Sequence, residues 1–336
     1  MDLLARLTVL GSLNMDISVT VPTLPSPGAT VLGGAASFAP GGKGANQAVA
    51  AARLGCAANI KVRMVGCVGD DDFGRTLKAT LAKEGVNDQA VRTVPGAPTG
   101  IAMITVDEAG ENIITVAPGA NREVGEQEIA ALGETAGPPS VLVISAEVPV
   151  PAILAALGTR SPEGLVPSRP RALTVLNLAP APAREETTAI LEARPDWLIV
   201  NESESAAVLG RPVAGLAEAA RAAADLVAVG ARNAVVTAGA AGAAYHAMHG
   251  ESQNKPLTGT VPAFTVHARD TVGAGDTFVG ALAVALAAGI PPDAAVTAAS
   301  AAAATAATRP GTQEGMPRPA DIRAATGYQW PLSVAN

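Results

Sequence analysis

Short apolar runs recur along the chain, and each is followed by a polar residue or a glycine. The runs are almost continuously hydrophobic, which is typical of strands buried on both faces of a sheet. Helical patterns lie between several of them, as at residues 73–84. This alternation predicts an α/β fold with a largely parallel central sheet flanked by helices. The predicted strands lie at residues 7–10, 61–68, 141–145, 173–177, 197–200 and 234–237.

A looser, alternating pattern marks a second group of predicted strands. Residues 17–21 and 29–38 alternate between apolar and polar positions and are separated by a proline-containing segment. Residues 100–106 and 112–117 read as a hairpin around a short turn. Alternation leaves one face of a sheet open, so we predict that these strands form a small separate sheet.

Three segments need more than hydropathy to interpret. The Ala-rich region 281–308 is apolar enough to suggest a membrane span, but residues 291–293 (Pro-Pro-Asp) divide it. Because alanine is only weakly lipophilic, we predict two buried helices there. A β-type run at 263–268 is expected to be a strand. Residues 160–171 are rich in proline, and we interpret them as a surface insertion.

Composition defines the core and excludes one class of partner. Hydrophobic residues make up 49% of the 336 residues but aromatic residues only 2%, so Val, Leu, Ile and Ala must fill the interior. Lys plus Arg number 23 against 30 Asp plus Glu, a formal charge of −7. This acidic balance argues against a nucleic-acid-binding surface.

The cysteines and the N-terminal sequence bear on cellular location. Cys56 and Cys67 form no CxxC pair and no metal-ligand cluster, so we expect reduced, buried thiols of a cytoplasmic protein. The first residues carry charge at Asp2 and Arg6 and lack the long apolar segment of a signal peptide. We expect no association with a membrane.

Residues 270–278 (Asp-Thr-Val-Gly-Ala-Gly-Asp-Thr-Phe) carry the strongest chemical signal. Two glycines stand where a helix is predicted to begin, and the free N–H groups of a helix start attract anions such as phosphate. Asp276 would repel a bound phosphate, which suggests that it takes a proton from an attacking hydroxyl. A second carboxylate, Asp270, would hold a cation. The alternative is an ordinary helix start with an acidic first turn.

Two N-terminal segments predict contacts to a ligand with several hydroxyl groups. Asn14 and Asp16 follow the first predicted strand and are two residues apart, so their side chains face the same way. An amide and a carboxylate together can bind neighbouring hydroxyls. Residues 41–46 join three glycines to Lys43 and Asn46, so the backbone can approach a ligand beside a cation. Taken alone, turn formation is the simpler explanation of the Asn14 and Asp16 pair.

Other polar positions have simple structural explanations. Asn201 follows a predicted strand and matches a helix capping box with Glu204. A role for Glu204 with magnesium or phosphate is the alternative. His246 and His249 lie three apart without a third ligand, which indicates a solvated loop and not a metal site. His267 is expected to be a core or edge histidine with its hydrogen bonds satisfied.

Together these motifs resemble the ribokinase family of carbohydrate kinases. The resemblance covers residues 7–319 and implies a single Rossmann-like α/β domain, residues 1–336, with a small β-sheet lid formed by strands within 17–40 and 98–118. In that family the lid packs against a second subunit, so a homodimer is implied. The matching motifs are Gly11–Asp16, Gly41–Ala50, Asn177–Ala181, Asn201–Glu204 and Asp270–Phe278.

The resemblance implies that ATP phosphorylates D-ribose at its 5-hydroxyl, giving ribose 5-phosphate and ADP. Asp276 would deprotonate that hydroxyl. The backbone N–H groups of Gly273, Ala274 and Gly275 would form an anion hole for the transferred phosphate. The implied sugar-binding positions are Asn14, Met15, Asp16, Gly42, Lys43, Gly44, Ala45, Asn46, Glu147 and Asp276.

The resemblance also implies a nucleotide site and two cations. Mg²⁺ would accompany ATP, with Glu204 organising the metal or a phosphate, and K⁺ would be an activating cation. The implied ATP-binding positions are Asn201, Thr237, Ala238, Gly239, Ala240, Ala241, Gly242, Gly275, Asp276 and Ser300. The implied potassium positions are the Asp270 carboxylate, the carbonyls of Val272, Ala306, Arg309 and Gly311, and Gly315, where ribokinases often have a serine.

Two other functions stay open on the sequence. A related sugar or nucleoside kinase, of the 2-deoxyribose, fructose or adenosine type, would share the turn at 273–276 and differ in the pocket made by Asn14, Asp16 and Lys43. A non-catalytic nucleotide- or sugar-binding module would have no use for Asp276.

Overall fold

A nine-stranded sheet forms the centre of the computed structural model, which describes residues 6–133, 141–158, 172–248 and 256–332. The strand order is β13-β12-β11-β10-β9-β8-β1-β4-β5, and every pair from β11 to β5 is parallel. The two pairs at the other edge are antiparallel. The strands are β1 (Arg6–Leu10), β4 (Lys61–Gly69), β5 (Asn87–Val94), β8 (Val141–Ser145), β9 (Leu173–Asn177), β10 (Trp197–Asn201), β11 (Asn233–Thr237), β12 (Gly242–Met248) and β13 (Pro256–Pro262).

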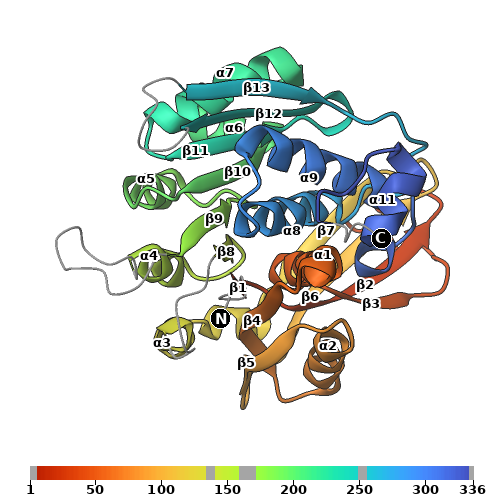
Figure 1. Ribbon diagram of the computed structural model, residues 1–336. Coiled ribbons are helices and arrows are strands. Elements are labelled where there is room, and N and C mark those ends of the chain that lie inside the picture. Colours follow the sequence, from red (N-terminus) through yellow and green to blue (C-terminus); the bar gives the residue numbers. More distant parts are fainter. Residues whose placement is uncertain (1–5, 134–140, 159–171, 249–255, 333–336) are drawn as a thin grey trace.

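Helices cover both faces of this sheet (Figure 1). Alternate residues of a strand enter different cores: Val141 and Val143 of β8 join one, and Leu142 and Ile144 join the other. The continuous apolar runs of the sequence are therefore explained by burial on both faces. The first core includes α1 (Lys43–Gly55), α2 (Asp72–Lys83), α8 (Ala274–Ala287), α9 (Pro292–Ala306) and α11 (Pro319–Thr326), and the second includes α3 (Glu126–Gly133), α4 (Val150–Gly158), α5 (Arg184–Glu192) and α7 (Gly215–Ala228). The short helices α6 (Glu202–Leu209) and α10 (Thr312–Gly315) and the 3₁₀ turns η1 (Cys56–Ala58), η2 (Gly119–Glu123) and η3 (Gly239–Ala241) complete the fold.

A separate four-stranded sheet, which we call the lid, has the order β3-β2-β6-β7. Its strands are β2 (Asn14–Val21), β3 (Ser37–Gly41), β6 (Gly100–Asp107) and β7 (Asn112–Ala117). Figure 1 shows it beside the α1 and α11 end of the molecule. The small sheet predicted from the alternating patterns is confirmed. It leaves several large apolar side chains exposed, among them Phe38, Met103, Ile113, Ile114 and Val116.

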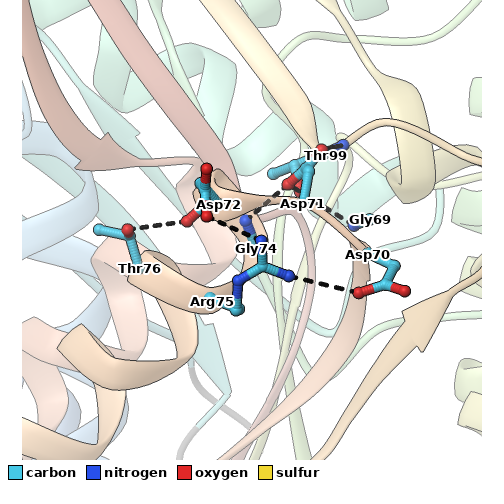
Figure 2. Close-up of polar contacts among 8 residues, drawn as sticks. All are labelled: Gly69, Asp70, Asp71, Asp72, Gly74, Arg75, Thr76 and Thr99. Atoms are coloured by element: carbon cyan, nitrogen blue, oxygen red, sulfur yellow. Dashed lines mark hydrogen bonds and ion pairs between the residues drawn. The ribbon is translucent and has the colours of Figure 1, made fainter.

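Asp71, which caps α2, ties the lid to the central sheet (Figure 2). Its Oδ1 accepts hydrogen bonds from the Gly74 N–H at 2.8 Å and the Thr99 hydroxyl at 2.5 Å, and its Oδ2 accepts from the Thr99 N–H at 2.8 Å. The Thr99 hydroxyl oxygen accepts in turn from the Gly69 N–H at 2.9 Å. Because Thr99 directly precedes β6, these bonds attach the start of that lid strand to the end of β4.

Several predicted elements were wrong. Residues 263–268 form no strand, because the edge of the sheet is completed by β12 and β13, which the sequence reasoning missed together with β5. Of the run at 29–38, only Ser37 and Phe38 are in a strand. The preceding residues lie outside regular structure and are largely exposed, so their alternation reflected no buried face. The predicted insertion at 160–171 and His249 lie outside the described residues.

The expectation for the cysteines holds for only one of them. Cys67 is buried and Cys56 is exposed, because Cys56 lies just beyond the C-terminal end of α1. Both thiols are free. None of the helices in the described ranges is long and apolar enough to span a membrane. The Ala-rich region instead forms α8 and α9, which pack against each other in the first core.

Candidate active site

Asn14 and Asp16 lie at the start of lid strand β2, not on the tip of central strand β1 as predicted. Residues 11–13 link the two strands, so the chain passes from the central sheet into the lid at this point. Asn14 is paired with Gly41 of β3 on one side and with Gly100 of β6 on the other. The two polar side chains therefore stand where the lid meets the central sheet.

Gly42 brings the start of α1 against this junction. Its φ is 87°, in the left-handed region, and a Cβ on it would lie 2.6 Å from the Asn14 backbone nitrogen. No other residue fits there without displacing β2. Lys43 begins the helix directly after it. Gly44 and Ala45 pack against the backbone of Gly11 and Ser12, and Met15 is part of the first core.

Glu147 reaches the same junction from the loop after β8. Its Oε2 accepts hydrogen bonds from the Ser12 hydroxyl at 2.6 Å and from the Lys43 N–H at 3.3 Å. The tip of β8 is thereby joined to the turn after β1 and to the start of α1. The positions predicted at 14–16, 42–46 and 147 are brought together by these contacts.

Asp276 lies in the first turn of α8 and is only 8% exposed. Its Oδ2 accepts from the Asn46 amide at 2.9 Å, and its Oδ1 accepts from the Gln47 amide at 3.0 Å. Two consecutive residues of α1 thus hold the two oxygens of one carboxylate. A buried carboxylate needs such donors, since it would otherwise lose its hydration without compensation.

The amide groups that hold Asp276 are themselves held. Gln313 Nε2 donates to Asn46 Oδ1 at 3.0 Å, and Gln47 Nε2 also donates to Asn177 Oδ1 at 3.0 Å. Gln47 and Asn177 lie within motifs that carry the family resemblance, but neither they nor Gln313 were among the predicted site residues. Their common signal is burial of amides far apart in sequence, which a single sequence does not reveal.

A cluster of charges surrounds Asp16. The pKa of Asp16 is raised to about 7, mainly by burial and also by the nearby carboxylates of Glu147 and Asp276, against the opposing effect of Lys43. Asp276 also raises the pKa of Lys43, and this effect outweighs the desolvation of the ammonium group. Since a pKa perturbed by burial and by specific partners is common at functional sites, this cluster is the strongest candidate in the described chain.

The start of α8 presents free backbone donors beside Asp276. Gly273 precedes the helix with φ 77°, and a Cβ on it would lie 2.9 Å from Thr312 Cγ2, so glycine is required there. The Ala274 N–H donates to the Thr271 carbonyl at 3.2 Å. Within the described residues, the N–H groups of Gly273 and Gly275 have no such partner. An anion at this helix start would therefore meet Gly273 and Gly275 more readily than Ala274.

The predicted nucleotide positions follow neighbouring strands of the central sheet. Asn201 ends β10, and the segment from Thr237 to Gly242 links β11 to β12. Its residues Gly239, Ala240 and Ala241 are exposed and accessible to a ligand. Ser300 is buried in α9, and its hydroxyl donates to the Val296 carbonyl at 2.9 Å. The carboxyl ends of parallel strands are a common place for nucleotide binding.

Asn201 and Glu204 form the predicted capping box. The Glu204 N–H donates to Asn201 Oδ1 and the Asn201 N–H donates to Glu204 Oε2, both at 2.8 Å. Burial raises the pKa of Glu204. In the described residues no group of three His, Cys, Asp or Glu side chains could hold a metal ion. A magnesium ion here would depend on phosphate and water oxygens for most of its ligands.

Carbonyl groups converge near Gly315, at one end of α10. A Cβ on Gly315 would lie 3.3 Å from the Arg309 carbonyl oxygen and 3.5 Å from those of Ala306 and Pro310. Asp270 is anchored in the same region, because its Oδ2 accepts from the Gly311 N–H at 2.9 Å and its Oδ1 from the Val272 N–H. A carboxylate and several carbonyl oxygens are a donor set that fits a hard cation.

Comparison with known proteins identifies the family. Residues 4–319 match the pfkB family carbohydrate kinase description. The chain belongs to this family. Membership makes the protein a carbohydrate kinase, an enzyme that transfers a phosphoryl group from a nucleotide to an alcohol group. The predicted family and fold class are thereby confirmed.

Three relatives are informative. The chain is 37% identical to a ribokinase of Schizosaccharomyces pombe, over 85% of this chain and 86% of that protein. It is 33% identical to a deoxyribokinase of Salmonella typhi, over 93% of this chain and 95% of that protein. The structure of Arabidopsis thaliana ribokinase complexed with ribose and ATP is similar with a TM-score of 0.77 and 26% identity, covering 97% of this chain and all of that one (100%).

The raised pKa of Asp16 gives a prediction about stability. Between about pH 4 and pH 7 the folded state binds more protons than the unfolded state at Asp16, so this group lowers stability as the pH rises through that window. We expect Asp16→Asn to increase the free energy of unfolding by about 1–3 kcal/mol at pH 8. The gain should fade toward pH 4. Denaturant unfolding at several pH values measures it.

The matched control is Asp293→Asn, at an exposed acidic residue in the first turn of α9. It should show no comparable gain at pH 8. A wild type more stable than Asp16→Asn at pH 8 would contradict the electrostatic description of the cluster.

Proposed function

We propose that this enzyme uses ATP to phosphorylate D-ribose at its 5-hydroxyl, giving D-ribose 5-phosphate and ADP. One observation carries the proposal: Asp276, buried beside free helix-start N–H groups, is electrostatically coupled to Asp16 and Lys43. A base, an anion site and a polar sugar site are thus adjacent. Its similarity to a ribokinase, and to the ribokinase structure that holds ribose and ATP, supports ribose as the sugar.

In the proposed reaction, Asn14, Asp16, Lys43, Asn46 and Glu147 bind the sugar hydroxyls. Asp276 accepts the proton of the 5-hydroxyl group while the oxygen of that hydroxyl forms a bond to the γ-phosphorus of ATP. The bond from that phosphorus to the β,γ-bridging oxygen breaks, and ADP leaves.

Backbone N–H groups at 273–275 stabilise the negative charge that develops on the transferred group. The nucleotide lies along Asn201, the 237–242 segment and the α9 side near Ser300. Mg²⁺ would supply positive charge to the phosphates when bound, and Glu204 would help to organise the ion or a phosphate. The Glu204 carboxyl lies close enough to Lys43 and Asp276 for their charges to affect its pKa.

A second candidate substrate is 2-deoxyribose, because the chain is also 33% identical to a deoxyribokinase. Fructose- and adenosine-type kinases are more distant alternatives. Release of ADP in the presence of each of a panel of pentoses, hexoses and nucleosides distinguishes these substrates. A protein that releases ADP with none of them would overturn the proposal.

We further propose that the chain is one domain, residues 1–336, in the cytoplasm, where its two free thiols stay reduced. The lid and the central sheet share a hydrophobic core, since Met15 and Ile17 of the lid strand β2 pack with the first core.

Substitution of the proposed base tests the mechanism. Asp276→Asn keeps the size of the side chain and removes its capacity to accept the proton. We expect kcat to fall by about 10²- to 10⁴-fold, while the Kd for ATP stays within a few-fold of wild type. Steady-state kinetics and calorimetric titration measure the two quantities, and near-normal turnover would exclude Asp276 as the base.

We propose that K⁺ binds between Asp270 and the carbonyls of Val272, Ala306, Arg309 and Gly311, with Gly315 supplying no side-chain oxygen. Replacing Na⁺ by K⁺ should raise kcat and also raise Tm, because a ligand that binds only the folded state stabilises it. Asp270→Ala should lose both responses. Asp293→Ala, on the exposed start of α9, serves as control. Equal Tm values in K⁺ and Na⁺ for wild type would contradict the site.

We propose that the exposed apolar residues of the lid pack against the lid of a second copy. Ile114 and Val116 of β7 are 53% and 44% exposed, which is unusual for such residues on a free surface. Ile114→Lys should convert a dimer to a monomer in analytical ultracentrifugation. Val229→Lys, at an exposed apolar residue at the end of α7, should leave the mass unchanged. A monomeric wild type would refute the proposal.

A further inference from the structure

Asn121, in the 3₁₀ turn η2 after lid strand β7, is buried at the junction of lid and central sheet. It is 1% exposed, and its side chain makes three hydrogen bonds. Its Oδ1 accepts from the Leu13 N–H at 2.9 Å, and its Nδ2 donates to the Leu13 carbonyl at 3.1 Å and to Asn14 Oδ1 at 2.8 Å. No motif in the sequence pointed to this residue.

The backbone of Leu13 determines which way the Asn121 amide points. An N–H can only donate and a carbonyl can only accept, so Oδ1 of Asn121 must face the Leu13 N–H and Nδ2 must face the Leu13 carbonyl. The same Nδ2 then meets the side chain of Asn14. Because it is a donor, it requires the oxygen of the Asn14 amide on that side.

Asn14 is therefore held with its NH₂ group turned away from Asn121. Among the described residues this NH₂ group has no hydrogen-bond partner, whereas Oδ1 of Asn14 accepts the hydrogen bond from Asn121. We propose that Asn121 is a positioning residue that makes Asn14 a hydrogen-bond donor, and not an acceptor, toward the sugar. The inference rests on the proposed sugar-binding role of Asn14 and adds the residue that sets its polarity.

The surroundings leave the Asn14–Asn121 pair little freedom. A Cβ on Gly100 would lie 2.2 Å from Asn14 Oδ1 and 2.4 Å from Asn121 Nδ2, so the two amides fill the space beside this glycine. Thr99, the residue before it, is fixed by Asp71 and Gly69 (Figure 2). The amide pair thus sits against a backbone that is anchored to the central sheet.

The donor character of Asn14 matters because the neighbouring side chain, Asp16, is an acceptor. Asp16, when ionised, can only accept hydrogen bonds. A hydroxyl group donates one proton and accepts at its lone pairs, so a donor at Asn14 and an acceptor at Asp16 bind neighbouring hydroxyls in complementary ways. Two acceptors side by side would leave one hydroxyl oxygen without a donor, and an unpaired buried polar group is costly.

Asn121→Asp tests the inference with almost no change of shape. The new carboxylate still accepts from the Leu13 N–H, but it can donate neither to the Leu13 carbonyl nor to Asn14. The Asn14 amide should therefore rotate and present its oxygen to the sugar. We expect KM for ribose to rise about 10- to 100-fold, with kcat and KM for ATP within about three-fold of wild type. A general structural defect would instead change KM for ATP and kcat as well.

A double-mutant cycle shows whether Asn121 acts through Asn14. Asn14→Ala should itself raise KM for ribose, and adding Asn121→Asp to it should cause little further loss. If the two losses multiply, Asn121 acts independently of Asn14 and the inference is wrong. An unchanged KM for ribose in a folded Asn121→Asp protein would also overturn it.

The structural control is Asn233→Asp. Asn233 also bridges two backbone groups, donating to the Asp196 carbonyl at 2.6 Å and accepting from the Met248 N–H at 2.7 Å, but it lies at the opposite end of β11 from Thr237. It should lower Tm without changing KM for ribose.

If Asn121→Asp does not fold, Asn14→Asp, which replaces the donor by an acceptor and keeps Asn121, should still lose ribose binding. Wild-type affinity in that variant would refute the need for a donor.

Failure of this inference is distinguishable from failure of the proposed function. A wild type that phosphorylates ribose, with a cycle that shows no coupling, refutes only the role of Asn121. A wild type that phosphorylates another sugar refutes the ribose assignment, and the same cycle is then measured with that sugar.

Discussion

The carboxylate of Asp276 is buried and held by two amides from the facing helix, and the active site depends on this contact. Asn46 and Gln47 occupy its two oxygens, so the start of α8 is fixed against the start of α1. A buried carboxylate without these donors would cost several kcal/mol. The contact therefore links stability to the proposed function, because it also places the proposed base beside the proposed sugar-binding residues of the first third of the chain.

The second constraint is the passage of the chain from the central sheet into the lid. Leu13 is the last residue before β2, and its backbone N–H and carbonyl are both bonded by Asn121. Thr99 makes an equivalent junction at β6 through Asp71. These two attachments are polar and buried or half-buried, and they fix the starts of β2 and β6 to the central sheet. Several apolar side chains of the lid remain exposed.

The site also has an energetic cost. Asp16, Glu147 and Asp276 lie together around one lysine. Burial and the two like charges each disfavour the ionised form of Asp16 and so raise its pKa. Proteins keep such arrangements where binding or catalysis requires them. A hydroxylated ligand would relieve part of the cost, because it offers donors to carboxylates that have lost their water.

The sequence alone determined the architecture and the family. The alternating strand and helix pattern and the looser pattern of the lid specified the α/β fold, since these features depend on neighbouring residues. The kinase family followed from the resemblance carried by the motifs at 11–16, 41–50 and 270–278. It missed β5, β12 and β13 and wrongly assigned a strand at 263–268, because strands at or next to a sheet edge are identified by their pairing and not by their own pattern. Only the tertiary structure decided that Asn14 lies in the lid, that Asn46 and Gln47 hold the carboxylate of Asp276, and that Asn121 donates to Asn14 Oδ1. Those relationships join residues about a hundred or more positions apart, and no periodicity within a segment encodes them.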